Sequence, residues 1–191
     1  MKHLAGHDHV MIDCETLDIT NSPVVFSLSA IKFDIDSVNE KEEFDANNLN
    51  HFHIALKFDD QIKKGFDVGS SALAFHLKTC PAYLLNCING SDIRLVDTAT
   101  GLMMFTEFVK DFNNPMFWTA GAINDHVWID NLYTAYGLRN PMPYNKRFCF
   151  RTIREAFHGM SPRYVNDHDS FSDSVNQAIA LQQIYKGVVG E

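Results

Sequence analysis

The sequence predicts an α/β fold in which a mixed sheet of five strands is flanked by helices. Three observations predict it. The first third of the chain contains three apolar segments separated by polar ones, which is the pattern of consecutive strands. Farther along, apolar residues recur mainly at helical spacing. Two more short apolar segments lie between these helices, and such alternation is typical of a sheet covered by helices.

The first three strands are expected over residues 9–15, 22–34 and 51–56. The second of them, SPVVFSLSAIKFD, has the alternation of a strand with two different faces. The polar segment 36–42 is predicted to be a turn. Because short turns join these strands, we expect an antiparallel meander.

Two short helices are expected next, over residues 70–79 and 81–89. Ser70 is a candidate N-cap for the first, because serine caps helix N-termini well. Pro81 suits the start of the second, where no backbone N–H is needed.

The second half of the chain alternates between the two kinds of element. An amphipathic helix is predicted over 98–114, because its large apolar residues recur at helical spacing. A buried strand is expected at 115–121, then a helix over 125–137 ended by Gly137. The last two predicted elements are an extended segment that leads into a helix over 146–159, and a final helix over 169–187, closed by Gly187.

Composition limits the class of protein. The 191 residues are 46% hydrophobic, which fits one domain over residues 1–191 with a sizeable core. No apolar run has the length of a membrane span, which needs about 20 residues, and the polar start MKHLAGHDHV does not read as a signal peptide. The four cysteines form no CxxC pair, so we expect reduced thiols and a cytoplasmic protein, in the host cytoplasm if a phage encodes it. The net charge of -8 disfavours a nucleic-acid binder that works by phosphate neutralisation, unless bound cations supply positive charge.

Two acids interrupt the first apolar strand, VMIDCETLD. Asp13 and Glu15 are two positions apart, so in a strand they point to the same face. Two neighbouring like charges are costly unless something offsets them. A cation, a pair of basic side chains, or water at a strand end would each do so.

Other acids fall at the boundaries of predicted elements. Asp125 follows a buried strand, and Asp173 lies in the first turns of the last helix, five residues after His168. Five residues of helix turn by about 500°, so both side chains would not share one face of a continuous helix. We therefore expect His168 to lie on the preceding loop and to face the same cleft as Asp173. Taken alone, Asp125 could simply cap a helix and Asp173 could simply favour a helix dipole.

If these four carboxylates meet, they require divalent cations. All-oxygen ligands select hard ions such as Mg²⁺ or Mn²⁺. Two such ions about 4 Å apart are suited to phosphodiester hydrolysis. A histidine with a pKa near neutrality could take the proton of the attacking water.

The three segments IDCETL, GAIND and HDSFSDSVNQA resemble, in order, the exonuclease motifs of the DEDD superfamily. The histidine five positions before the last aspartate resembles the DEDDh (DnaQ-like) branch. The surrounding sequence resembles a subgroup that contains phage exonuclease A-type exodeoxyribonucleases and mycobacterial-type exoribonucleases. This resemblance covers roughly residues 8–187.

The resemblance implies a ribonuclease H-like fold and a two-metal active site. It implies that two Mg²⁺ or Mn²⁺ ions are held by four carboxylates and that His168 is the general base. The implied metal ligands are Asp13, Glu15, Asp125 and Asp173. Thr16 and Leu17 would support the terminal nucleotide through backbone and wedge contacts. The implied partners are 3′ ends of single-stranded DNA or RNA, and related enzymes are often homodimers, although the sequence has no interface signature.

Two further side chains are candidates for substrate binding. Where the subgroup often carries tryptophan after the third strand, this chain has Phe75 and His76, which leaves the terminal-base preference open. Arg151 belongs to the best basic cluster of an acidic chain, where phosphate contact competes with a solvated helix end or a bridge to Glu155. The pair His51 and His53 lacks the further ligands of a zinc site.

The sequence therefore predicts a metal-dependent 3′→5′ exonuclease that releases nucleoside 5′-monophosphates from single-stranded ends, with DNA slightly favoured. Two alternatives remain. One is an exoribonuclease that trims RNA tails or short oligoribonucleotides. The other is an inactive nuclease fold that serves as a binding module.

Overall fold

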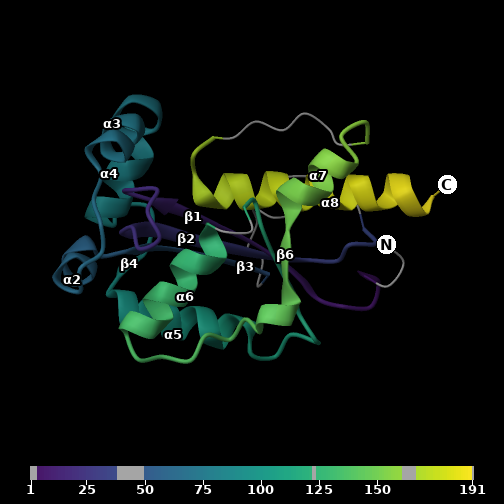
Figure 1. The fold of residues 1–191 in the computed structure, drawn as a ribbon, viewed down its shortest axis with the longest axis horizontal. Helices are drawn as coiled ribbons and strands as arrows, with labels where there is room; N and C mark the ends of the chain where they lie inside the picture. Colours follow the sequence, from purple (N-terminus) through teal and green to yellow (C-terminus); the bar gives the residue numbers. More distant parts are fainter. Residues whose placement is uncertain (1–3, 38–49, 122–123, 161–166, 191) are drawn as a thin grey trace.

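A computed structural model describes residues 4–37, 50–121, 124–160 and 167–190. Its centre is a six-stranded mixed sheet with the strand order β4-β3-β2-β1-β5-β6 (Figure 1). β1, β2 and β3 form the predicted antiparallel meander, whereas β5 pairs parallel to β1. The strands are β1 His9–Thr16, β2 Val25–Phe33, β3 His51–Leu56, β4 Leu95–Val96, β5 Met116–Thr119 and β6 Arg147–Cys149.

Helices cover both faces and one end of this sheet (Figure 1). α7 and α8 lie on one face, α5 and α6 lie on the other, and α3 and α4 pack beyond the end of β1 and β2. The helices are α2 Phe58–Lys63, α3 Ser70–Thr79, α4 Pro81–Asn89, α5 Thr98–Val109, α6 Asp125–Ala135, α7 Phe150–Ala156 and α8 Ser170–Val189.

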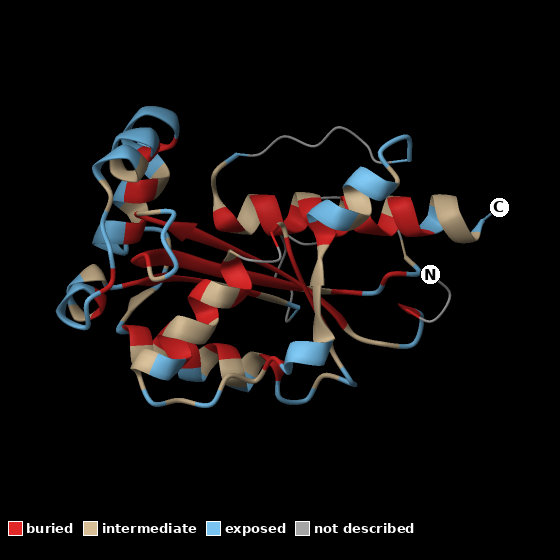
Figure 2. Ribbon diagram, viewed as in Figure 1, coloured by how far each residue is buried: buried red, intermediate tan, exposed pale blue. Residues whose placement is uncertain are grey.

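The alternation of side chains along β1 divides the core in two. Val10 and Ile12 belong to the cluster under α5 and α6, whereas Met11 belongs to the cluster under α8. The central strands β1, β2 and β5 and the inner helix faces are mostly buried, the short edge strands β4 and β6 are only partly buried, and the outer helix faces are exposed (Figure 2). Because side chains alternate between the two faces along β1, Asp13 and Glu15 point to the same face as Met11, toward α8.

The predicted fold class is confirmed, but the expected number of strands was wrong. The sixth strand, β4, has only two residues, and it pairs parallel to the end of β3 through Ala55 and Leu56. Two residues are too few to produce a periodic signal. The helix α2 was missed because it is also short: it has six residues and lies within a segment that was expected to be a loop.

Several predicted boundaries also shift. β2 begins at Val25: the N–H of Val24 donates to the backbone oxygen of Asp67, outside the sheet, and its own oxygen accepts from the N–H of Leu17, just after β1. Gly69 takes the N-cap position of α3, so Ser70 is its first helical residue. Pro81 does begin α4, as predicted.

The C-terminal ends of two helices show when glycine stops a helix. Gly137 follows α6 with a φ of 64°, a conformation that other residues rarely adopt, and it closes that helix as predicted. Gly187 was a wrong prediction for the end of α8, which continues to Val189 with Gly190 after it.

Most of the predicted turn at 36–42 lies outside the described residues. Among those that are described, no helix has both the length and the apolar character needed to cross a membrane.

Candidate active site

A cleft of about 530 Å³ opens at the C-terminal end of β1, where α3, α6 and α8 approach the sheet. The cleft brings together residues that are far apart in sequence. Its lining includes all five predicted catalytic residues: Asp13, Glu15, Asp125, His168 and Asp173. The predicted convergence of acids from three segments is therefore present in the structure.

Asp13 and Glu15 enter the cleft from β1, on the face that packs against α8. Both side chains are buried, with 8% of each residue exposed. The Asp13 Oδ1 accepts a hydrogen bond from the side-chain amide of Gln177 on α8, at 3.0 Å. The Glu15 Oε2 lies 3.9 Å from Nε2 of His76, a buried histidine on α3.

Asp125 is the first residue of α6, directly after the N-cap residue Asn124. Its Oδ1 accepts a hydrogen bond from the backbone N–H of Cys14 at 3.1 Å. Since Cys14 lies between Asp13 and Glu15, this bond ties the start of α6 to the acidic end of β1. Asp125 is therefore not the N-cap of α6, the simple structural role that the sequence left open, because Asn124 occupies that position.

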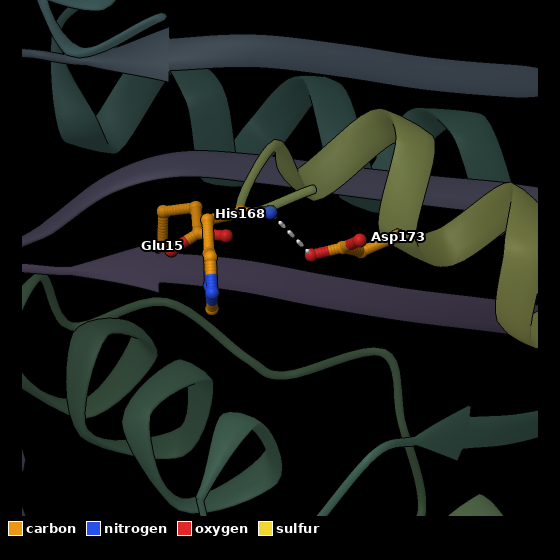
Figure 3. A group of neighbouring side chains, drawn as sticks. All are labelled: Glu15, His168 and Asp173. Carbon is orange, nitrogen blue, oxygen red and sulfur yellow. Dashed lines mark hydrogen bonds between the residues drawn. The ribbon is translucent and has the colours of Figure 1, made fainter. Parts of the chain in front are cut away.

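His168 and Asp173 come from the loop before α8 and its first turn. The backbone N–H of Asp167 donates to Oδ1 of Asp173 at 2.8 Å. The backbone N–H of His168 donates to Oδ2 of Asp173 at 3.1 Å (Figure 3). His168 has a φ of 55°, which is uncommon for residues other than glycine. As expected, His168 lies outside the helix, and ligand atoms of Glu15, His168 and Asp173 all lie within 4.8 Å of one another.

A buried cluster of hydroxyl groups holds the start of α8 in place. Oγ of Ser170 lies 2.6 Å from the hydroxyls of both Ser27 and Ser29 on β2, and 2.9 Å from the Tyr83 hydroxyl on α4. The same Tyr83 hydroxyl also lies 3.1 Å from Nε2 of His53 on β3. Because Ser170 follows His168 closely and precedes Asp173, this cluster anchors the segment that carries both of them.

Burial and mutual repulsion raise the proton affinity of the acids. Burial, together with the charges of Asp173 and Asp125, raises the pKa of Glu15 to about 8. Burial also raises the pKa of Asp125 to about 7 and that of Asp173 to about 6, although hydrogen bonds from backbone N–H groups oppose both shifts. For Asp13, burial and the three neighbouring carboxylates raise the pKa well above its ordinary value.

These residues suit a divalent cation. Among the described residues that line the cleft, Arg151 is the one permanent cation, whereas five residues of the lining carry carboxylates: the four predicted ligands and Asp18. Positive charge placed between the acids would offset both their repulsion and the cost of their burial. Carboxylate oxygens are ligands of hard ions such as Mg²⁺ and Mn²⁺. The donor set therefore fits a divalent cation.

The structure places three of the four residues predicted to bind substrate in the cleft and the fourth in the core. Thr16, Phe75 and Arg151 line the cleft, whereas Leu17 is 2% exposed and packs in the core below it. The apolar side chain that β1 and its following turn do present to the cleft is Ile19, which is 89% exposed.

The structure also shows which other side chains do not serve the cleft. His53 stacks against Tyr83 and Phe171, with ring centroids 6.1 and 5.4 Å away, so it belongs to the packing around α8. Arg154, which belongs to the same basic cluster as Arg151, pairs with the neighbouring Glu155 at 2.8 Å, so here the cluster makes the bridge to Glu155. Trp118 is 1% exposed and is a core residue.

Among the lining residues that the sequence did not assign to the site, Gln177 and His76 lie against the predicted acids. Gln177 had a usable signal, because it lies four positions after Asp173 and so on the same helix face. His76 had none. It reaches the cleft because α3 packs beside β1, where its Nε2 lies 3.0 Å from the backbone oxygen of Thr16.

Comparisons with solved structures confirm the exonuclease fold. A zinc-bound complex of E. coli exonuclease I with single-stranded DNA aligns over 97% of the chain with a TM-score of 0.66 and 12% identity. A complex of E. coli exonuclease I with a dA13 oligonucleotide aligns over 95%, with a TM-score of 0.65 and 12% identity. The chain spans 41% and 40% of the length of these two proteins.

A family comparison covers almost the whole chain. A search of curated proteins found no match to this chain. The model of the 3′-5′ exoribonuclease Rv2179c-like domain matches residues 8–185, a span that contains every predicted catalytic residue. The chain therefore belongs to the family of Rv2179c-like 3′-5′ exoribonuclease domains.

Proposed function

We propose that this protein is a divalent-metal-dependent 3′→5′ exonuclease that shortens single-stranded nucleic acid and releases nucleoside 5′-monophosphates. One observation carries the proposal: four buried carboxylates from β1, α6 and α8 converge with His168 in a single cleft. Membership of an exoribonuclease family favours RNA as the substrate. The DNA complexes of exonuclease I, which is similar in fold, keep DNA as the second candidate.

In this proposal Asp13, Glu15, Asp125 and Asp173 hold two Mg²⁺ or Mn²⁺ ions. When bound, the ions supply positive charge that activates water and stabilises the charge developing on the phosphate. The protein supplies a fixed, buried cage for them. Hydrogen bonds from Cys14 to Asp125, and from the loop before α8 to Asp173, hold the cage in position.

His168 is proposed to take the proton from the attacking water at a nitrogen of its ring. Its ring meets the Phe75 ring edge to face, with centroids 4.7 Å apart, so an apolar contact limits its orientations. Phe75 lines the cleft and is 41% exposed, which supports its proposed contact with the terminal base. Arg151 also lines the cleft, where its charge suits a phosphate.

A matched set of oligomers tests the proposal. RNA and DNA 20-mers of one sequence, labelled at the 5′ end, would be incubated with the protein in Mg²⁺, in Mn²⁺ and in EDTA. We expect a ladder that shortens from the 3′ end, nucleoside 5′-monophosphates as products, and no reaction in EDTA. Cleavage of circular single strands, or activity that survives EDTA, would contradict the assignment.

Replacing His168 with glutamine is expected to reduce kcat by about 100-fold or more, because general-base catalysis typically contributes 10²–10⁴-fold. Binding of Mn²⁺ should change little, since the four carboxylates remain. The exposed His158 on the loop after α7 provides the control His158→Gln, which should retain full activity. Wild-type kcat in His168→Gln would remove the histidine from the mechanism.

A further inference from the structure

Gln177 occupies an unusual position in the cleft. It lies on α8 one turn after Asp173, it is 2% exposed, and it lines the cleft beside the acids. Its Nε2 donates a hydrogen bond to Oδ1 of Asp13 at 3.0 Å. The bond joins α8 directly to β1 at the centre of the acidic cage.

An amide suits this position better than the alternatives. Asp13 already faces the charges of Asp125, Glu15 and Asp173. A lysine or arginine here would neutralise Asp13 and compete with a bound cation, whereas the amide donates a hydrogen bond without adding charge. The bond also restricts rotation of the carboxylate, so that Asp13 is held in one orientation before any ion binds.

The other end of the same amide argues against a purely packing role. Oε1 of Gln177 is buried, and it accepts no hydrogen bond from the described residues. A buried acceptor without a partner destabilises the fold, so an apolar side chain would be the better choice if packing were all that mattered. The neighbouring inward positions of α8, Ala178 and Leu181, are indeed apolar.

We propose that Gln177 is a positioning residue, which orients the Asp13 carboxylate and thereby sets the affinity of the cleft for its divalent cation. This inference rests on the proposed function, because it assumes that Asp13 is a metal ligand. Groups that hold a metal ligand from behind commonly change metal affinity by 10- to 100-fold when they are removed.

The chain offers a matched control on the same helix. Gln182 is also fully buried, and its Nε2 donates to the backbone oxygen of Asp34 at 2.7 Å, away from the cleft. Gln177→Leu and Gln182→Leu therefore remove equivalent buried amides from one helix. Only the first of them loses contact with a proposed metal ligand.

The experiment is a calorimetric titration of each full-length variant with Mn²⁺ in the absence of nucleic acid. We expect Gln177→Leu to raise the Kd for Mn²⁺ by about 10- to 100-fold and Gln182→Leu to leave it within two-fold of wild type. At saturating Mn²⁺, kcat of Gln177→Leu should return to within a few-fold of wild type. If the leucine variant does not fold, Gln177→Met serves in its place, because the flexible methionine has a similar length.

Each outcome decides a different claim. An unchanged Kd in Gln177→Leu, or an equal weakening in both variants, would overturn the positioning role and leave the exonuclease proposal intact. A wild-type protein that binds no Mn²⁺ and shortens no oligomer would overturn the proposed function itself.

Discussion

Replacing Glu15 with glutamine is expected to lower kcat/KM by about a thousand-fold while stabilising the metal-free protein. The loss follows from a weakened metal centre, whose charge is worth several kcal/mol in the transition state, and 1.36 kcal/mol corresponds to ten-fold in rate. The gain in stability follows from electrostatics. Burial and neighbouring carboxylates raise the pKa of Glu15 to about 8, so the folded protein holds a proton there that the unfolded chain would release at pH 7.

Glutamine resembles the protonated acid, and it needs no proton. At pH 7 the metal-free variant should therefore gain free energy of unfolding on the order of 3 kcal/mol, at 1.36 kcal/mol for each unit of pKa. Urea unfolding in EDTA measures the gain, and the oligomer assay measures the loss. A cluster that served only to stabilise the fold would show the reverse, with reduced stability and unaltered chemistry.

The control makes the same chemical change far from the cleft. Glu107 on α5 is exposed and pairs with Lys110. Exposed pairs of this kind contribute about 0–1 kcal/mol, so Glu107→Gln should match wild type in both assays. If Glu15→Gln behaves like Glu107→Gln, the acids of the cleft are not a metal centre.

The elements of the site could be predicted from the sequence because each leaves a local mark. Asp13 and Glu15 interrupt an apolar strand, and Asp125 lies where a strand gives way to a helix. The separation of His168 from Asp173 excluded a shared helix face, and the structure places His168 in the loop. Local marks of this kind locate side chains at the ends of elements, and topology then brings those ends together.

What the sequence could not supply depends on contacts between distant segments. The side chain of Leu17 was expected near the nucleotide, but the turn after β1 directs it into the core and exposes Ile19 instead. The hydroxyl cluster that joins Ser170 to Ser29 and Tyr83 involves three separate elements with no shared motif. The two-residue β4 depends on pairing with β3 rather than on its own periodicity.

The stabilisation that Mg²⁺ gives the protein is expected to increase steeply with pH between about 5 and 8. Burial raises the pKa of Glu15 to about 8, of Asp125 to about 7 and of Asp173 to about 6 in the metal-free fold. An acid whose pKa is higher in the folded chain binds the extra proton there, so folding becomes less favourable as pH rises from the unfolded to the folded pKa. The window therefore runs from about pH 4, the ordinary carboxyl value, to about 8.

Metal binding acts against this loss, because the ion binds ionised carboxylates and displaces their protons. The shift in Tm between Mg²⁺ and EDTA should be small at pH 5.5 and largest near pH 8. Calorimetry in buffers of different ionisation enthalpy should show release of at least about one proton per protein at pH 7, and fewer in Glu15→Gln.

The comparison between Mg²⁺ and EDTA also removes an opposing effect. Burial lowers the pKa of His53 and of His126 to about 4, so both histidines favour the folded state less as pH falls below their ordinary value of 6.5. Their effect on stability is present with and without metal, so it cancels in the difference between the two Tm values. A Tm shift that is independent of pH, or that is larger at pH 5.5 than at pH 8, would mean that the ion is not held by the raised-pKa carboxylates. A shift that grows with pH and shrinks in Glu15→Gln would tie metal, charge and cleft together through the same four acids.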